Sequence, residues 1–182
     1  MTEISDRYER LADDFARTVS EVPEDRWSSP SPCDGWTALD VVRHVVDTQS
    51  MFLGLVGRDA GPVPLVDGNP DAAWATASAA VLADLTDPER AGAEFDGFFG
   101  RTSFEQAVDR FVSFDLVVHR WDLARAVGGD EHIDPADARS VIDGAAVFGD
   151  ALHGPGVCGP ALQVGRDADV QTQMLGLLGR RS

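Results

Sequence analysis

The chain has 182 residues, of which 43% are hydrophobic and 25% charged, as expected of one soluble globular domain with its own core. Its net charge of −16 argues against binding to nucleic acid or to anionic membranes, because both require basic patches. The N-terminus resembles no signal peptide and no apolar run is long enough to span a membrane, so we expect a cytoplasmic protein. The two cysteines, Cys33 and Cys158, are too few and too distant to define a disulfide framework.

The N-terminal half reads as helices separated by loops rich in Pro and Gly. Apolar residues at helical spacing predict the first helix, and Thr37 with Asp40 three residues later predicts the start of the second. The last segment of this half is expected to be irregular, and its three Phe residues to plug one end of a bundle. In chain order, the predicted segments are helix 3–20, loop 23–35, helix 37–56, loop 57–69, helix 70–85 and the irregular segment 86–101.

The C-terminal half predicts the longest helix, over residues 103–127. The sequence Thr102-Ser-Phe-Glu105 is typical of a capping box, and Gly128-Gly129 ends the pattern. Asp134-Pro135 predicts a further helix to about Leu152, followed by an extended segment 153–165 and a short helix 167–178. We therefore predict a single all-α domain over residues 1–182, built as a four-helix bundle with a short C-terminal extension and helix.

Two histidines stand out because each lies on a helix face that should be buried. His44 and His119 each have an Asp four residues before them and another three residues after them, and residues at these spacings are neighbours on a helix. One helix can thus present an imidazole and a carboxylate to a single cation. Three protein ligands and one open position are typical of catalytic zinc sites. We predict His44, Asp115 and His119 as ligands of a divalent metal.

The remaining carboxylates of this pattern, Asp40, Asp47 and Asp122, are candidates for orienting the imidazole N–H groups. An alternative is that each His forms only a hydrogen-bonded pair with an Asp in the core. Cys33 is interpreted as a small buried loop residue, and Trp36 and Trp121 as core or pocket-wall residues beside the site. We expect Arg120 and Arg125 to form ion pairs, and Arg43 is a weak candidate for binding a substrate anion. We expect His132 and His153 to be exposed and to bind no metal.

Three segments resemble the DinB-like four-helix bundles, in a branch related to the N-terminal domain of mycothiol-dependent maleylpyruvate isomerases. The resemblance covers roughly residues 5–180. The three segments are Pro32-Cys33-Asp34-Gly35-Trp36-Thr37 with Val42-Arg43-His44-Val45, Asp115 to Ala126, and Gly154-Pro155 to Leu178-Gly179-Arg180.

The resemblance implies a zinc or nickel ion held by His44, Asp115 and His119, the residues already selected from spacing. It also implies a thiol-dependent S-transferase or isomerase that uses mycothiol or a similar low-molecular-weight thiol as co-substrate. The chain departs from the isomerase in two respects: we expect no separate C-terminal domain, and residues 70–85 contain no Arg or Lys to hold a substrate carboxylate.

We therefore predict a metalloenzyme that activates a small-molecule thiol for attack on an electrophile, with no nucleic-acid or membrane partner; a homodimer is open. The catalytic and cofactor-binding residues are not identified by the sequence. One alternative is a non-catalytic or stress-associated bundle with a structural ion, whose fourth position a further carboxylate such as Asp122 or Asp47 closes. Another is a metal-free bundle that acts through partner surfaces.

Overall fold

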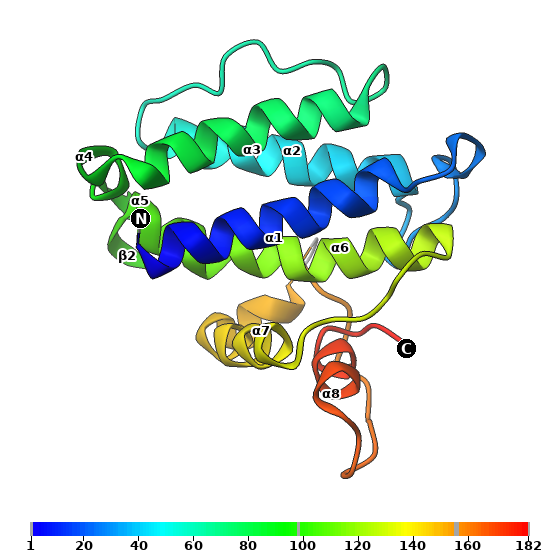
Figure 1. Ribbon diagram of the computed structural model, residues 1–182. Helices are drawn as coiled ribbons and strands as arrows, with labels where there is room; N and C mark the ends of the chain where they lie inside the picture. The colour runs from blue at the N-terminus through cyan, green and yellow to red at the C-terminus, as the bar shows by residue number, and fades with distance from the viewer. Residues whose placement is uncertain (1, 98, 155–156, 182) are drawn as a thin grey trace. The chain divides into compact units, whose positions relative to one another are not determined.

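The structure is a computed structural model that describes residues 2–97, 99–154 and 157–181, and its regular elements are nearly all helical (Figure 1). The chain forms two compact units, residues 1–131 and 132–182. In the described part of the chain, no helix combines the length and the apolar character needed to cross a membrane. The all-α prediction is confirmed, and the prediction of a single domain stays a prediction.

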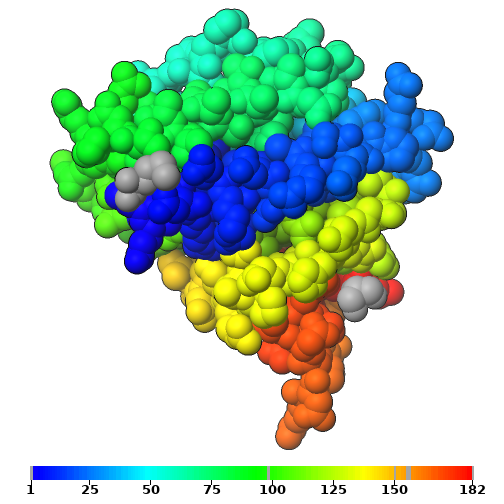
Figure 2. Space-filling view, in the orientation of Figure 1, coloured from blue at the N-terminus to red at the C-terminus, as the bar shows by residue number. Residues whose placement is uncertain are grey.

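Four long helices form the bundle of the first unit. Helix α1 (Glu3–Ser20) packs against α3 (Pro70–Thr86) and α6 (Ser113–Val127), and α2 (Ala38–Leu55) also packs against α3 and α6. Each helix therefore has two neighbours, as in a four-helix bundle. Figure 2 shows the side chains of α1 and α3 in close contact along one face of this unit. The fully buried large side chains of the bundle include Tyr8, Phe15, Trp74, Phe104, Leu116, Trp121 and Leu123.

The sequence signals at the helix ends are mostly confirmed. Thr37 and Asp40 form a reciprocal capping box at the start of α2, which ends at Leu55, one residue before the predicted end. Gly128 adopts a left-handed conformation with φ of 77° and ends α6 after Val127. A short 3₁₀ turn, η1 (Glu24–Arg26), lies in the predicted loop before α2.

The segment after α3 is more regular than the sequence predicts. It holds a helical turn, α4 (Pro88–Ala91), and an antiparallel hairpin of β1 (Glu94–Gly97) and β2 (Gly100–Ser103). The prediction of irregular structure was wrong here because strands of four residues are too short for an alternating pattern to be recognised. Of the three predicted plug residues, Phe95 is half-buried, Phe99 is exposed, and Phe98 lies outside the described residues.

The predicted long helix spans the expected residues but is not uniform. It consists of α5 (Phe104–Ala107), a π-helical turn η2 (Val108–Val112) and α6. The backbone stays right-handed helical at both junctions, so one π turn is inserted into a continuous helix. The cap is Ser103, whose Oγ accepts from the Gln106 N–H at 3.4 Å, and not Thr102 as predicted.

The second unit contains α7 (Pro135–Phe148), the 3₁₀ turn η3 (Gly149–His153) and α8 (Val170–Leu177), with α7 packed against α8. Asp134 caps α7 as predicted, because its Oδ1 accepts from the Ala136 N–H at 2.7 Å. The α-helical part ends at Phe148, four residues before the predicted end, and the chain continues as a 3₁₀ turn. In the predicted extended segment, Pro155 and Gly156 lie outside the described residues.

Candidate metal centre between α2 and α6

Helices α2 and α6 bring the three predicted ligands together. His44 Nε2 and Asp115 Oδ2 are 3.2 Å apart although these residues are 71 positions apart in the chain. The rings of His44 and His119 meet edge to face, with centroids separated by 4.7 Å. One donor atom from each of the three residues lies within 4.8 Å of the other two. The two helices therefore place two imidazoles and one carboxylate around a common point.

The three side chains differ in exposure. His119 is 10% exposed, whereas His44 is 36% and Asp115 30% exposed. His119 is the inner member of the group, and His44 and Asp115 form its solvent-accessible edge. The donor group is thus accessible to solvent at His44 and Asp115 and mostly closed at His119.

The loop before α2 places Trp36 against both rings. Its centroid lies 5.0 Å from that of His44 and 6.0 Å from that of His119. Backbone hydrogen bonds from Ser31 N to Trp36 O at 2.8 Å and from Trp36 N to Cys33 O at 3.0 Å fix the turn. The predicted position of Trp36 beside the site is confirmed. Trp121, two residues after His119 on α6, is fully buried and belongs to the core of the bundle, one of the two roles expected for it.

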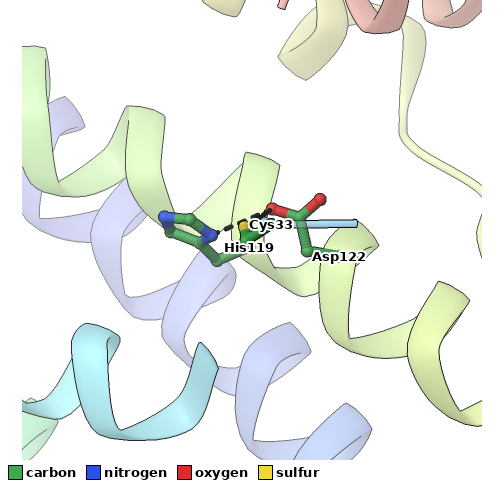
Figure 3. Close-up of side chains that lie close together, drawn as sticks. All are labelled: Cys33, His119 and Asp122. Carbon is green, nitrogen blue, oxygen red and sulfur yellow. Dashed lines mark hydrogen bonds and ion pairs between the residues drawn. The ribbon is translucent and has the colours of Figure 1, made fainter. Parts of the chain in front are cut away.

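Cys33 and Asp122 form a second group of side chains on the Nδ1 side of the His119 ring (Figure 3). Asp122 Oδ2 is 3.0 Å from His119 Nδ1, and the Cys33 thiol donates to the same oxygen at 3.4 Å. Asp122 thus contacts an imidazole as predicted from the spacing of three residues. The contact of Cys33 was missed, because it joins a loop to a helix 89 positions later and leaves no periodic signal in the sequence.

Asp40 does not orient an imidazole, so this part of the prediction was wrong. Its Oδ2 accepts from the backbone N–H of Thr37 at 2.9 Å and from the Thr37 hydroxyl at 2.6 Å, and its Oδ1 accepts from Arg43. The hydrogen bonds from Thr37 lower the pKa of Asp40. Arg43 also pairs with Asp67, and both carboxylates raise the pKa of its guanidinium. Arg43 is therefore engaged by two acids and is a poor candidate for binding a substrate anion.

The pKa of His44 reflects opposing effects. Burial lowers the pKa, but the hydrogen bond with Asp115 and the negative charges of Asp115, Asp47 and Asp122 outweigh it, so the net shift is upward. Asp47 is exposed and acts on His44 through its charge. In the metal-free protein, these carboxylates favour a protonated His44. A cation bound at this position would take the place of that proton.

The donor group fits a divalent ion. Two donors on a tetrahedral zinc ion are separated by about 3.3 Å, which follows from zinc–ligand bonds of about 2.0–2.1 Å. The His44–Asp115 pair is already at that distance, and the third donor lies within 4.8 Å. Imidazole nitrogens and a carboxylate oxygen are the ligand types that zinc and related metals use in catalytic sites.

The other singled-out residues lie elsewhere in the two units. Arg125 pairs with Glu131 at 3.0 Å as expected, whereas Arg120 donates to the Asp130 carbonyl at 3.2 Å. His132 and His153 are exposed as predicted, and His153 Nδ1 contacts the Gly159 carbonyl at 2.7 Å. Cys158 accepts a long contact of 3.9 Å from Arg180.

The chain matches the family model described as mycothiol maleylpyruvate isomerase N-terminal domain over residues 8–124, a span that includes every residue of the centre. It is 31% identical over 153 residues to the uncharacterized protein Rv0738 of Mycobacterium tuberculosis, covering 82% of this chain and 81% of the relative. Rv0036c of the same organism, also named as uncharacterized, is 36% identical over 50 residues, which are 28% of this chain and 20% of that protein. No solved structure matches the chain.

The family match and the helical bundle agree with each other, since the matched residues contain the four long bundle helices except the ends of α1 and α6. The chain therefore belongs to the mycothiol maleylpyruvate isomerase N-terminal domain family, a DinB-like family of helical bundles.

Proposed function

We propose that this protein is a thiol-dependent metalloenzyme in which His44, Asp115 and His119 hold a divalent ion, zinc or nickel. Its co-substrate is a mycothiol-like low-molecular-weight thiol, which it activates for transfer to an electrophile or for isomerisation. The observation that carries the proposal is the convergence of three donor atoms from two helices within 4.8 Å, with one side of the group open to solvent. The family match supports the choice of thiol.

Each residue around the proposed ion would have a separate role. His44 and His119 supply neutral imidazole nitrogens, and Asp115 supplies one negative charge beside them. Trp36 lies close to both rings and restricts water on that side. The partly exposed edge formed by His44 and Asp115 is the side from which a thiol can approach. When bound, a divalent ion supplies positive charge that lowers the pKa of a thiol and so increases the fraction present as the reactive thiolate.

The substrate proposed here is not maleylpyruvate. Helix α3 carries no Arg or Lys to hold a carboxylate, and Arg43, the basic residue next to His44, is engaged by Asp40 and Asp67. The proposal is therefore a thiol transferase or an isomerase for a different electrophile.

A structural ion is the less favoured alternative. Structural zinc sites have four protein ligands, whereas catalytic sites keep one position for water or substrate. Among the described residues, only three donors belong to the His44 group. Asp122, one of the two carboxylates considered for the fourth position, is in contact with the Nδ1 atom of His119.

The first test is the metal content of tag-free protein, measured by elemental mass spectrometry after chelation and reloading with zinc or nickel. We expect about one ion per chain in the wild type and a loss of metal in His44→Ala and His119→Ala. His153→Ala is the matched control, because this exposed histidine contacts a backbone carbonyl of the second unit, and it should retain the metal. Retention of one ion per chain in His119→Ala would contradict the ligand assignment.

The second test concerns the thiol. Mycothiol should bind the zinc-loaded wild type in a calorimetric titration and should bind the chelated protein much more weakly. Loaded protein should then accelerate the loss of free thiol in the presence of a panel of electrophiles. If the wild type holds zinc but binds mycothiol equally well with and without the ion, the protein is a metal-binding bundle and the proposal of a thiol-activating enzyme is refuted.

A further inference from the structure

Cys33, Asp122 and His119 form a hydrogen-bonded chain behind the candidate metal centre (Figure 3). The thiol Sγ lies 3.4 Å from Asp122 Oδ2, and the same oxygen lies 3.0 Å from His119 Nδ1. Both hydrogen bonds are made to the same carboxylate oxygen of Asp122. A movement of Asp122 that changes its bond with Cys33 therefore also changes its bond with His119. The chain thus links the loop before α2 to a proposed metal ligand on α6.

The burial of these groups makes the chain energetically significant. Asp122 is completely buried and the His119 side chain is 10% exposed. A buried carboxylate is costly unless donors satisfy its oxygens. The Nδ1–H of His119 and the S–H of Cys33 are two such donors. A histidine that donates from Nδ1 keeps an unprotonated Nε2, which is the form that can bind a metal.

We propose that Asp122 and Cys33 are positioning residues for His119, an inference that rests on the proposed metal-dependent function. Asp122 fixes the tautomer and orientation of the ring, and Cys33 holds Asp122 in place through its thiol. The loop then contributes to both sides of the centre, because its Trp36 lies against the rings of His44 and His119 and its Cys33 acts through Asp122. This gives the Pro32–Thr37 motif a functional role that its sequence does not indicate.

The same three residues could instead bind a cation themselves, since their donor atoms also lie within 4.8 Å of one another. The hydrogen-bonded arrangement is favoured because His119 belongs to both groups. An imidazole that served one cation through Nδ1 and another through Nε2 would have to lose its last ring proton. The two assignments differ in whether the Cys33 sulfur is bonded to the metal, which spectroscopy can resolve.

The test is a titration of chelated protein with Co²⁺ and Zn²⁺ in the absence of any added thiol. Asp122→Ala should weaken metal affinity about 10- to 100-fold and change the visible spectrum of bound cobalt, as expected for loss of a group that orients a ligand. Cys33→Ala should weaken it about two- to tenfold, the value of one hydrogen bond. Cys33→Ser keeps a donor and should restore affinity to within about twofold of the wild type.

A double variant separates positioning from a general structural role. If Cys33 acts through Asp122, Cys33→Ala should cause no further loss of affinity in an Asp122→Ala background. The control is Cys158→Ser, which alters the other cysteine of the chain, in the second unit, and should leave the titration unchanged. Circular dichroism identifies variants that fail to fold, and Asp122→Leu, which fills the buried space without an accepting oxygen, replaces Asp122→Ala if the latter does.

Two results would overturn the inference while still showing a metal-binding protein, and the second would also replace the proposed ligand set. The first is wild-type affinity in folded Asp122→Ala or, if that variant fails to fold, in Asp122→Leu, which has no oxygen to accept from His119. The second is a thiolate-to-cobalt charge-transfer band that disappears in Cys33→Ser, because that band requires a sulfur ligand. Failure of the wild type to bind either metal would instead refute the proposed function itself, so the two failures are distinguishable.

Discussion

The substitution Asp115→Asn isolates the contribution of the metal to stability. Asp115 is 30% exposed and contacts His44, which is itself 36% exposed. An interaction between partly exposed groups is worth about 0–1 kcal/mol, so the metal-free variant should unfold close to the metal-free wild type. His119→Ala is less suitable for this purpose, because it removes a donor from the buried Asp122 carboxylate and so costs stability without any metal.

The metal contribution follows from mass action. A ligand that binds only the folded protein at 100 times its dissociation constant stabilises it by about 2.7 kcal/mol. For a chain of this size, 1 kcal/mol shifts the melting temperature by about 2–4 °C, which gives an expected increase of about 5–11 °C in the wild type. Asp115→Asn removes the only acidic ligand of the proposed set, so at the same free zinc concentration most of this increase should be lost.

The assay is thermal unfolding followed by circular dichroism, on chelated protein and over a series of buffered free zinc concentrations. Asp14→Asn is the matched control, since Asp14 is 33% exposed and pairs with Arg17 on the surface of α1. It should retain the full dependence on zinc. An Asp115→Asn protein with the same zinc-dependent increase as the wild type would refute the assignment of Asp115 as a ligand, whatever its effect on the metal-free protein.

Three further predictions concern the first unit. The pKa of His44 is raised in the folded state, so protonated His44 stabilises the metal-free protein at a pH below its ordinary pKa, and this stabilisation is lost as the pH rises through the raised value. Zinc affinity should increase over the same pH interval, because the metal displaces the proton. Urea unfolding and zinc titrations between about pH 5 and pH 8 test both trends, and a pH dependence of stability in the chelated protein that His44→Gln leaves unchanged would contradict the first. Tyr8→Phe should destabilise the bundle by about 1–3 kcal/mol, because it leaves the buried Gln49 Oε1 without the phenol donor now at 2.8 Å; urea unfolding measures this, and a change below about 0.5 kcal/mol would be inconsistent with that bond. Thr37→Ala should cost about 1 kcal/mol by removing the cap of α2, and Thr37→Ser should recover most of it in the same assay, unless the cap contributes nothing.

Local signals in the sequence predicted most helix ends, because a cap depends on residues only a few positions apart. The pairs Thr37–Asp40 and Asp134–Pro135 both begin helices as predicted. The same locality explains one error. A carboxylate four residues before His44 has the spacing of a group that contacts its ring, but Asp40 is also the third residue of its helix and is used by the cap. Spacing alone does not decide between these two roles.

Contacts between distant segments were predictable only where helical periodicity pointed to them. His44 and His119 each stand out on an apolar helix face, so a bundle brings them together once its helices pack. Cys33 has no such pattern, because it lies in a loop whose path depends on a turn between Ser31 and Trp36. The π turn at Val108–Val112 was also missed, since the segment keeps the apolar pattern of an ordinary helix.

The distribution of charge around the centre favours a cation over an anion. Asp115, Asp47 and Asp122 all act on His44, and together they raise its pKa. Arg43, the basic residue next to His44, forms ion pairs with Asp40 and Asp67. Two neutral imidazoles with these carboxylates carry net negative charge. A divalent ion offsets this charge, whereas an anionic substrate without the ion would add to it. An anionic thiolate would therefore be bound favourably only after the ion, which makes ordered binding, metal first and thiol second, the expected behaviour of this site.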